Sequence, residues 1–486
     1  MTVRWFGLRV GMAALAAMPM AVAAQDLLAV WRAAQERDRT LAVARADHAA
    51  SQTRREQSAA LSRGRVVLGL GAGLGTSSTR MNGAQFSAPG LGTSSGVDFA
   101  TSIHAGPMAR ASLIAQQPLL NRAQDASRAQ MEVAADMGDT AWRAAQSDLA
   151  LRIAERYLSL GVAQEQLRVA ERQAASVARA ATEAHDRFQL GDTPVTDTHE
   201  ADAALAAVRA QVEAARLQWV LKRQALTDST GLHEPVAQLP VRSISMNQPL
   251  PDWLEQAQAR NPQLQLAEHG VAMAERELQR RRASNATSVD LVAQAALERL
   301  AGPGDFGSAS NRSHNGMLGV QITIPLYDGG MSSAQASEGA RLLEKAQAQR
   351  DLAREQVAEQ VRAAWLTGHA DQARITALED GLKASAARLD ATRLGRTVGD
   401  RTLMDVLNAE NDQARATLAL AEARAAQLQN RLRLAALADR LDEGTLREVN
   451  AALQETPLEP ATAPPPASAP GPSVSRPARA VRGDRR

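Results

Sequence analysis

The sequence predicts an α+β membrane protein. In this fold class a long α-helical coiled-coil barrel continues into a transmembrane β-barrel, with four strands per protomer and an internal two-fold repeat. Three observations predict it. Only 3% of the 486 residues are aromatic although 45% are hydrophobic, so alanine-rich helices supply much of the apolar surface. Short segments in which apolar residues alternate with small or polar ones interrupt those helices. Landmarks of the first half recur in the second at nearly constant spacing.

The N-terminus has the pattern of a secretory signal peptide, which we predict for residues 1–24. Arg4 and Arg9 precede a short apolar stretch, and small residues follow before Gln25. A charged start, an apolar stretch and small residues at the cleavage point are the features of such a signal. A membrane anchor helix is the alternative, but the stretch is short and contains Pro19. We therefore expect an exported protein.

An internal repeat divides the mature chain into residues 25–248 and 249–454. Each half reads as a helix, two strands, a long helix and a second helix. Leu190-Gly191-Asp192 in the first half, for example, has its counterpart in Val398-Gly399-Asp400. Matching order and spacing in both halves indicate a duplicated structural unit.

Four segments are predicted as strands because apolar residues alternate with small or polar ones. They lie at residues 66–75, 109–117, 289–296 and 318–324. One apolar face suits a barrel wall between lipid and water, although a soluble sandwich would show the same alternation. The connecting segments, residues 77–108 and 301–315, are rich in Gly, Ser and Asn. We predict that they are exterior loops.

Helices are predicted for the remaining length of each half. Residues 121–190 and 330–397 are the longest, at about 100 Å each for a rise of 1.5 Å per residue. Four helices of roughly half that length are predicted at residues 27–62, 194–231, 251–283 and 402–439. Two short helices placed end to end would match one long helix as a paired, antiparallel strut.

Glycine and proline mark the junctions between these elements. Gly191 and Gly399 are predicted to take positive φ in tight helix-to-helix turns. Pro118 and Pro325 are expected at strand ends, with Gly329 and Gly330 leading into the long helix that follows.

The composition predicts neither an enzyme nor a nucleic-acid-binding protein. The chain has no cysteine, and its eight histidines form no metal-binding motif. The formal charge is only +2, with both signs interspersed along the helices. We therefore expect no catalytic residue, metal or cofactor. Residues 455–486, rich in Pro and Ala and basic at the end, are predicted to be a disordered tail.

Four strands cannot close a barrel, so the fold requires self-assembly. An open sheet edge in hydrocarbon leaves backbone groups unsatisfied at several kcal/mol each. Single-chain barrels begin at about eight strands, so a dimer or a trimer is the smallest closure.

The residues resemble the TolC family of outer-membrane efflux and secretion channels over nearly the whole mature chain. The paired halves, Pro118, the Pro-Leu-Tyr-Asp-Gly-Gly run at 325–330 and the Gly-x-x-x-x-x-Asp turns carry the match. The resemblance implies a homotrimer with a twelve-stranded barrel among the lipids of the cell outer membrane. Its helical part would lie in the periplasm and dock on an inner-membrane transporter and a periplasmic adaptor protein.

The resemblance also implies a periplasmic gate at the helix-to-helix turns. The matching positions are Thr196, Asp197, Arg401, Asp405 and Asn408. Asn408 replaces the second of two ring carboxylates, and Arg396 stands where a gate tyrosine is often found. The alternative for these polar residues is ordinary helix capping.

Three functions remain open. The first is the outer-membrane channel of a type I secretion system, exporting a protein such as a repeat-containing toxin with an ABC transporter. The second is the outer duct of a multidrug efflux pump, and the third is a periplasmic coiled-coil scaffold without a pore. Many efflux ducts of the family are lipoproteins with a cysteine after the signal. Because this chain has no cysteine, we favour the first.

Overall fold

A computed structural model describes residues 26–90, 92–243 and 248–454. The predicted signal peptide and tail lie outside the described residues. Two helices are much longer than the rest, α3 (Arg122–Gln189) and α7 (Met331–Thr397). The other helices are α1 (Leu27–Arg37), α2 (Arg39–Leu61), α4 (Val195–Thr230), α5 (Leu250–Arg260), α6 (Pro262–Ala283), α8 (Leu403–Leu437) and α9 (Glu443–Gln454). The strands are β1 (Arg65–Ala88), β2 (Gly92–Leu120), β3 (Ser288–Gly304) and β4 (Gly307–Thr323).

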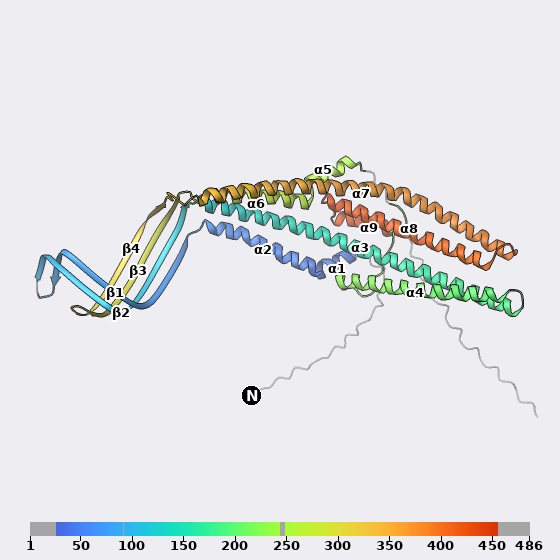
Figure 1. Ribbon diagram of the computed structural model, residues 1–486, viewed down its shortest axis with the longest axis horizontal. Helices are drawn as coiled ribbons and strands as arrows, with labels where there is room; N and C mark the ends of the chain where they lie inside the picture. The colour runs from blue at the N-terminus through green and yellow to red at the C-terminus, as the bar shows by residue number, and fades with distance from the viewer. Residues whose placement is uncertain (1–25, 91, 244–247, 455–486) are drawn as a thin grey trace, which may run out of the picture.

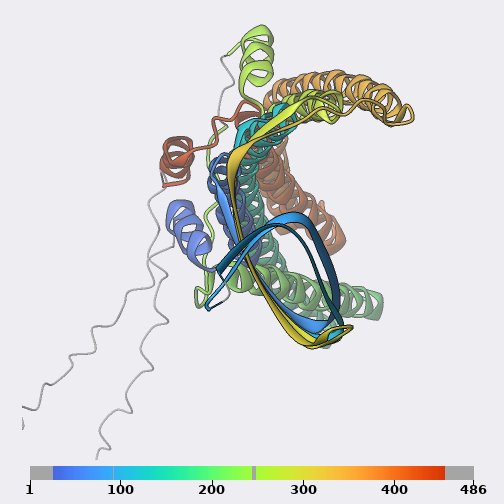
Figure 2. The ribbon, with the colours of Figure 1, turned by 90° about the vertical axis from the view of Figure 1, so that its left-hand side faces the viewer.

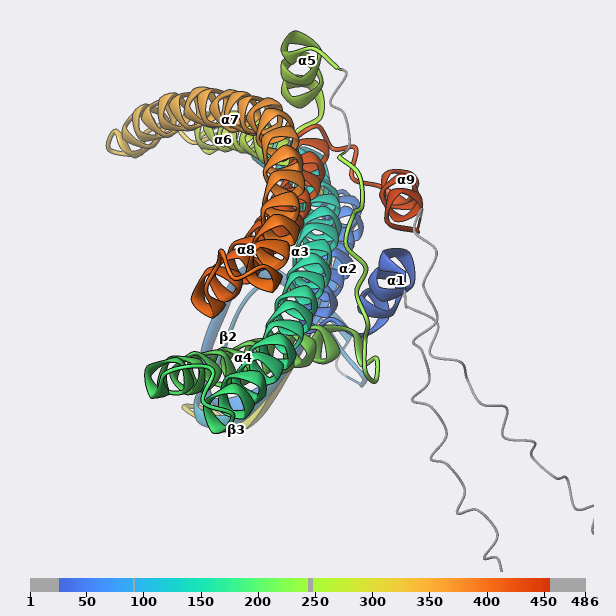
Figure 3. The same ribbon diagram turned by 90° about the vertical axis from the view of Figure 1, so that its right-hand side faces the viewer.

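The helices form two parallel struts that extend from one end of the sheet (Figure 1). In the first strut α2 and α4 pack along α3, and in the second α6 and α8 pack along α7. Both struts therefore pair one long helix with two shorter ones, as the repeat predicts. Viewed along the struts, the helices from α7 through α3 to α4 form an arc, with α1, α5 and α9 on its convex side (Figure 3). In the part of the chain described, no helix combines the length and apolar character that a membrane span needs.

Each half contains a helix break at the same landmark, which the sequence did not predict. Asp38 separates α1 from α2, and Asn261 separates α5 from α6, both with ψ of 124°. The carboxylate of Asp38 accepts hydrogen bonds from the backbone N–H of Thr40 and Leu41 at 2.9 and 3.0 Å. The Asn261 side chain likewise accepts from the N–H of Leu264 at 3.1 Å. Each residue ends one helix and caps the next.

The largest apolar core brings together buried residues of α1, α3, α4, α8 and α9. Leu27, Ile153 and Leu446 are fully buried there. Tyr157 is also buried, and its hydroxyl accepts a hydrogen bond from the backbone N–H of Gln238 at 3.0 Å. Burial raises the pKa of Tyr157 to about 12. The segment after α4 is thereby fixed to the outside of the first strut.

The four strands form one antiparallel sheet in the order β1-β2-β3-β4. Its register places most of the large apolar residues of the four strands on one face, because side chains two residues apart share a face. One row across the sheet, for example, is Val66, Ala115, Ala293 and Leu318. We call this side the apolar face; its large residues are Val66, Leu68, Leu70, Leu74, Leu113, Val289, Leu291, Leu297, Leu318, Val320 and Ile322.

The opposite side, which we call the polar face, carries small, polar and charged residues with a few apolar ones. One of its rows is Gly71, Arg110, Glu298 and Ser313. On β3 this face is the more covered of the two, since Val292 and Leu300 are buried whereas Leu291 and Leu297 are exposed. The difference indicates that the apolar face is the outer, convex one.

The prediction of exterior loops at residues 77–108 and 301–315 is wrong, because both segments are mainly strand. Most of the first segment belongs to the β1–β2 hairpin, which extends beyond the β3–β4 hairpin (Figures 1 and 2). The second segment is the tip of β3–β4, where Gly304 pairs with Gly307. Backbone hydrogen bonds between paired strands need no apolar side chains, so Gly, Ser and Asn did not end the strands here.

Candidate functional site

The tips of the two struts are built from the same helix-ending motif. Gly191 and Gly399 have φ of 80° and 84°, as predicted. The backbone N–H of Gly191 donates to the carbonyl of Phe188 at 3.0 Å, and that of Asp192 donates to Arg187 at 2.9 Å. The second turn repeats this pair of bonds. They define a Schellman motif, whose left-handed residue is normally glycine.

The predicted gate residues lie around these two turns. Thr196 and Asp197 are in the first turn of α4, and Arg401 lies just before α8. Asp405 is in the first turn of α8, and Asn408 follows one turn later on an exposed position. Among the described residues, the structure places no hydrogen bond or ion pair between the first-half pair and the second-half three. Within one protomer, therefore, these residues do not form a gate contact.

Asp405 takes part in a capping box with Thr402. The Thr402 hydroxyl accepts from the backbone N–H of Asp405 at 3.2 Å, and the carboxylate accepts from the N–H of Thr402 at 2.9 Å. The Thr402 hydroxyl also donates to the Asp405 carboxylate at 3.0 Å. The two bonds that the carboxylate accepts, from the Thr402 N–H and hydroxyl, hold the pKa of Asp405 below its ordinary value. Asp405 therefore matches the helix-capping alternative. Thr196 and Asp197 do not cap α4, because the N-cap residue of this helix is Pro194, which makes no side-chain cap hydrogen bond.

One ion pair near the tip joins the two halves of the chain. The guanidinium of Arg396, in the last turn of α7, lies 2.9 Å from the carboxylate of Glu183 in α3. Arg187 lies 3.0 Å from the same carboxylate. The Arg396 side chain is only 18% exposed, so water screens this pair less than a surface pair.

Sequence reasoning noted Arg396 as a departure from the family but missed Glu183. Glu183 lies in a helix with many charged residues, so nothing in the sequence distinguishes it as the partner of a residue in the other repeat. The only available signal was that Arg396 replaces an aromatic gate position and therefore needs a different partner.

Apolar contacts hold the second-half turn against the first half. Leu407 packs with Val177, Ala180 and Val208 of α3 and α4. Leu403, at the start of α8, contacts the same helices one turn nearer the tip. A cavity of about 360 Å³ lies beside this contact and is lined by both Glu183 and Arg396. The tip thus combines an apolar seam with a charged pair, and both join the two repeats.

The predicted strand-end residues lie near the junction between sheet and helices. Pro118 is inside β2, two residues before its end, and pairs in register with Asp290. Pro325 follows the end of β4 at Thr323. Gly329 and Gly330 have φ of 67° and 86°, and Gly330 is the N-cap residue of α7.

Asp328 orders this last turn. Its carboxylate accepts hydrogen bonds from the backbone N–H of Gly330 at 3.0 Å and of Ser332 at 2.8 Å. The Asp-Gly-Gly run therefore supplies both the acceptor and the two positive-φ residues that turn the chain from strand to helix.

A sheet with one continuous apolar face, joined to struts of roughly 100 Å, defines the protomer of a membrane channel with a long helical extension. The sequence pattern of the family described as outer membrane efflux protein matches residues 30–232 and 253–439. The chain belongs to this family. It is therefore a transport protein of the outer membrane, with its helical part in the periplasm, and not an enzyme.

Comparison with individual proteins supports this assignment. The chain is 27% identical to the outer membrane protein TolC of Escherichia coli over 335 residues, which cover 67% of this chain and 68% of that protein. It is 28% identical to the alkaline protease secretion protein AprF of Pseudomonas aeruginosa over 343 residues, covering 69% and 70%. The crystal structure of the outer membrane protein VceC of Vibrio cholerae has the same fold. Its TM-score is 0.67 at 19% identity, covering 86% of this chain and 98% of that one.

Proposed function

We propose that three copies of the chain close into a channel, with their sheets forming a twelve-stranded barrel and their struts a tube. The sheet order carries this proposal, because it leaves β1 and β4 as edges of a sheet whose outer face is apolar. Each unpaired edge group costs several kcal/mol in hydrocarbon, and pairing β1 of one protomer with β4 of the next removes that cost. Family membership supports the number three.

The oligomeric state tests the closure. Light scattering of the detergent-purified chain should give the mass of three protomers. Planar bilayers should show conductance through a narrow pore that prefers cations, because three Asp405 carboxylates would form an acidic ring in the lumen of the trimer. A monomer in detergent, or a trimer without conductance, contradicts the proposal and favours the scaffold without a pore.

We propose further that Thr196, Asp197, Arg401, Asp405 and Asn408 form the periplasmic gate in the trimer. Their place around the two turns supports this, since contacts missing within a protomer are available between neighbours. Arg401→Ala should enlarge the resting conductance of the channel. Arg401 is not part of the Thr402–Asp405 cap, so an unchanged conductance would leave Arg401 as an ordinary turn residue.

We propose that the exported cargo is a protein, passed from an inner-membrane ABC transporter through a periplasmic adaptor in a type I secretion system. The similarity to a protein named for alkaline protease secretion supports this, as does the absence of cysteine for a lipid anchor. The chain would then serve as the outer-membrane component of the system.

Deletion of the gene in its native host distinguishes the two transport functions. We expect one large protein to disappear from the culture medium, while drug susceptibility stays unchanged. A complementing copy should restore secretion. Unchanged secretion with raised drug susceptibility would show instead that the chain is the outer duct of a multidrug efflux pump.

A further inference from the structure

Two arginines lie directly opposite each other on neighbouring strands of the sheet. Arg299 of β3 and Arg312 of β4 are register partners on the apolar face, and both are exposed. Like charges directly opposite one another destabilise an antiparallel pair. Over the residues that the structure describes, neither arginine has an acidic partner. Within the described part of the chain, no acidic side chain neutralises their charge.

On β3 and β4 the pair lies at the outer boundary of the apolar face. From Val289 to Leu297 this face of β3 is apolar, and Arg299 is the next residue on it. Eight residues span about 26 Å along a strand, or about 20 Å across the membrane at a tilt of ~40°. The two guanidinium groups therefore lie near the headgroup level.

The boundary is on the extracellular side. The apolar face begins at Val289 and Ile322, next to the periplasmic helices, and ends toward the β3–β4 tip. The two arginines thus mark the outward-facing leaflet and not the periplasmic one.

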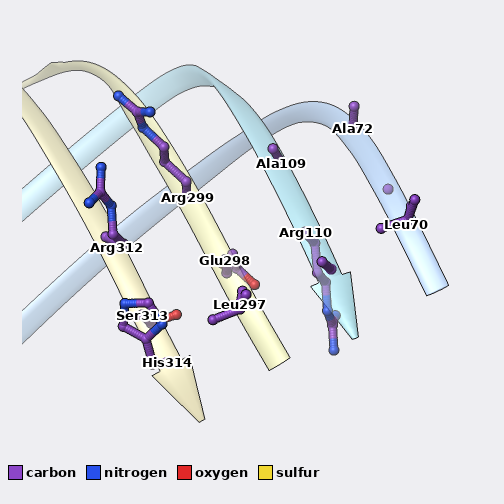
Figure 4. A pocket seen from close by; sticks show the side chains of 12 residues that line it. Leu70, Ala72, Ala109, Arg110, Leu297, Glu298, Arg299, Arg312, Ser313 and His314 are labelled. Carbon is purple, nitrogen blue, oxygen red and sulfur yellow. The ribbon is translucent and has the colours of Figure 1, made fainter. Parts of the chain in front are cut away.

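Other residues extend this surface. His314 lies on the same face of β4 two residues from Arg312, opposite Leu297. A depression of about 620 Å³ is lined by Arg299, Arg312, His314 and Leu297, and it also reaches Leu70. Figure 4 shows Arg299 and Arg312 side by side on their strands, whereas Arg110 of β2 points away from them. Cationic groups thus adjoin apolar side chains, the arrangement that a lipid headgroup and its acyl chains require.

We propose that Arg299, Arg312 and His314 bind the phosphate monoester of a lipid headgroup in the outward-facing leaflet. A phosphate monoester carries up to two negative charges and three acceptor oxygens, so it can neutralise both guanidinium groups at once. The apolar residues below would contact the acyl chains. This inference rests on the placement of the sheet in the membrane, but not on the identity of the cargo.

Lipid A, which carries two phosphate monoesters, is a suitable probe. The full chain in dodecyl maltoside is titrated with lipid A, and bound lipid is counted by native mass spectrometry. The double variant Arg299→Gln/Arg312→Gln should bind about tenfold more weakly, because charge-assisted bonds to phosphate are lost. Arg299→Lys/Arg312→Lys should retain most of the binding, which separates loss of charge from loss of folding.

Arg110→Gln is the matched control, because Arg110 lies at the same level of the sheet but on the polar face. It should bind lipid A as the wild type does. Dephosphorylated lipid A should bind the wild type and the double variant equally weakly. Equal binding of intact lipid A by both proteins would overturn the inference, and so would binding of inorganic phosphate alone with the affinity of lipid A.

Conductance of the same proteins in bilayers of uncharged lipid keeps the two proposals separate. We expect the double variant to conduct as the wild type does. A conducting trimer that binds lipid A no better than the double variant would refute the lipid site and leave the channel intact.

Discussion

At the residue scale, the periplasmic tip depends on a charged pair that connects different repeats. Arg396 reaches Glu183 across the interface between α7 and α3, beside the apolar contact of Leu407. The paired carboxylate also contacts Arg187 of its own helix. Because one partner is largely buried, loss of either charge should loosen the tip more than loss of a fully exposed pair.

Glu183→Gln should raise the resting conductance. Removing a partly screened ion pair costs about 0.5–1 kcal/mol, which corresponds to a roughly two- to fivefold larger open population. Single-channel recording in planar bilayers measures this. The exposed Glu200→Gln of α4 serves as the control. Equal conductance of Glu183→Gln and wild type would contradict a closing role.

A second charged cluster, around Glu277, should make the folding stability depend on pH. Glu277 of α6 accepts hydrogen bonds from Arg280 and Arg281, and they lower its pKa to about 2 from 4.5. A lowered pKa in the folded state stabilises the fold above the unfolded-state pKa, and this contribution is lost as the pH falls through the folded value.

Wild type should therefore be more stable than Glu277→Gln at pH 7, by about 1–2 kcal/mol for bonds to a charged group. The difference should shrink as the pH falls from 4.5 to 2. Thermal unfolding followed by circular dichroism at several pH values measures it. A difference that stays constant over this range would show that the carboxylate does not titrate with folding.

At the scale of elements, long helices were predictable because their patterns are local. The bounds of α3 and α7 agree with prediction to within one residue at each end. The break at Asp38 was missed because alanine-rich sequence on both sides favours helix. In the structure Asp38 is a cap because its carboxylate accepts from the N–H groups of Thr40 and Leu41, and the guanidinium of Arg152 lies 2.9 Å from the same carboxylate.

Replacement of two glycines by alanine should change the stability of the chain in opposite directions. Gly399→Ala should destabilise the chain by about 1 kcal/mol, because its φ of 84° disfavours a side chain. Gly381→Ala should stabilise it by about 0.5–1 kcal/mol, since Gly381 lies within α7 with open space around it. Chemical denaturation of both variants measures the difference. Effects of the same sign would contradict the conformational argument.

At the scale of the whole molecule, the sheet is the part of the protomer that contacts the membrane. Its register collects most of the large apolar residues of four separate strands on one outer face. The struts place the two tip turns at the far end of the molecule (Figure 1). A protomer therefore has a lipid-facing end, a periplasmic end and edges that must be paired.

Charge on the two faces of β4 should have unequal effects. Leu318→Arg places a cation on the apolar face and should cost about 2–4 kcal/mol in a bilayer. Gln321→Arg lies on the polar face opposite Asp290 and should be tolerated. The fraction of heat-resistant, membrane-inserted protein measures both. Equal yields of the two variants would show that the apolar face does not meet lipid.

The sequence by itself determined the long helices, the repeat, the alternation of the strands and the glycines of the tip turns. Each depends on neighbours within a few residues, on the helical or strand period or on a local φ, so a linear reading detects it. Only the tertiary structure decided the full length of the strands, the Arg299–Arg312 pairing and the contact between Arg396 and Glu183. These depend on which distant segments lie side by side, and register and helix packing set that arrangement through the burial of surfaces from the whole chain.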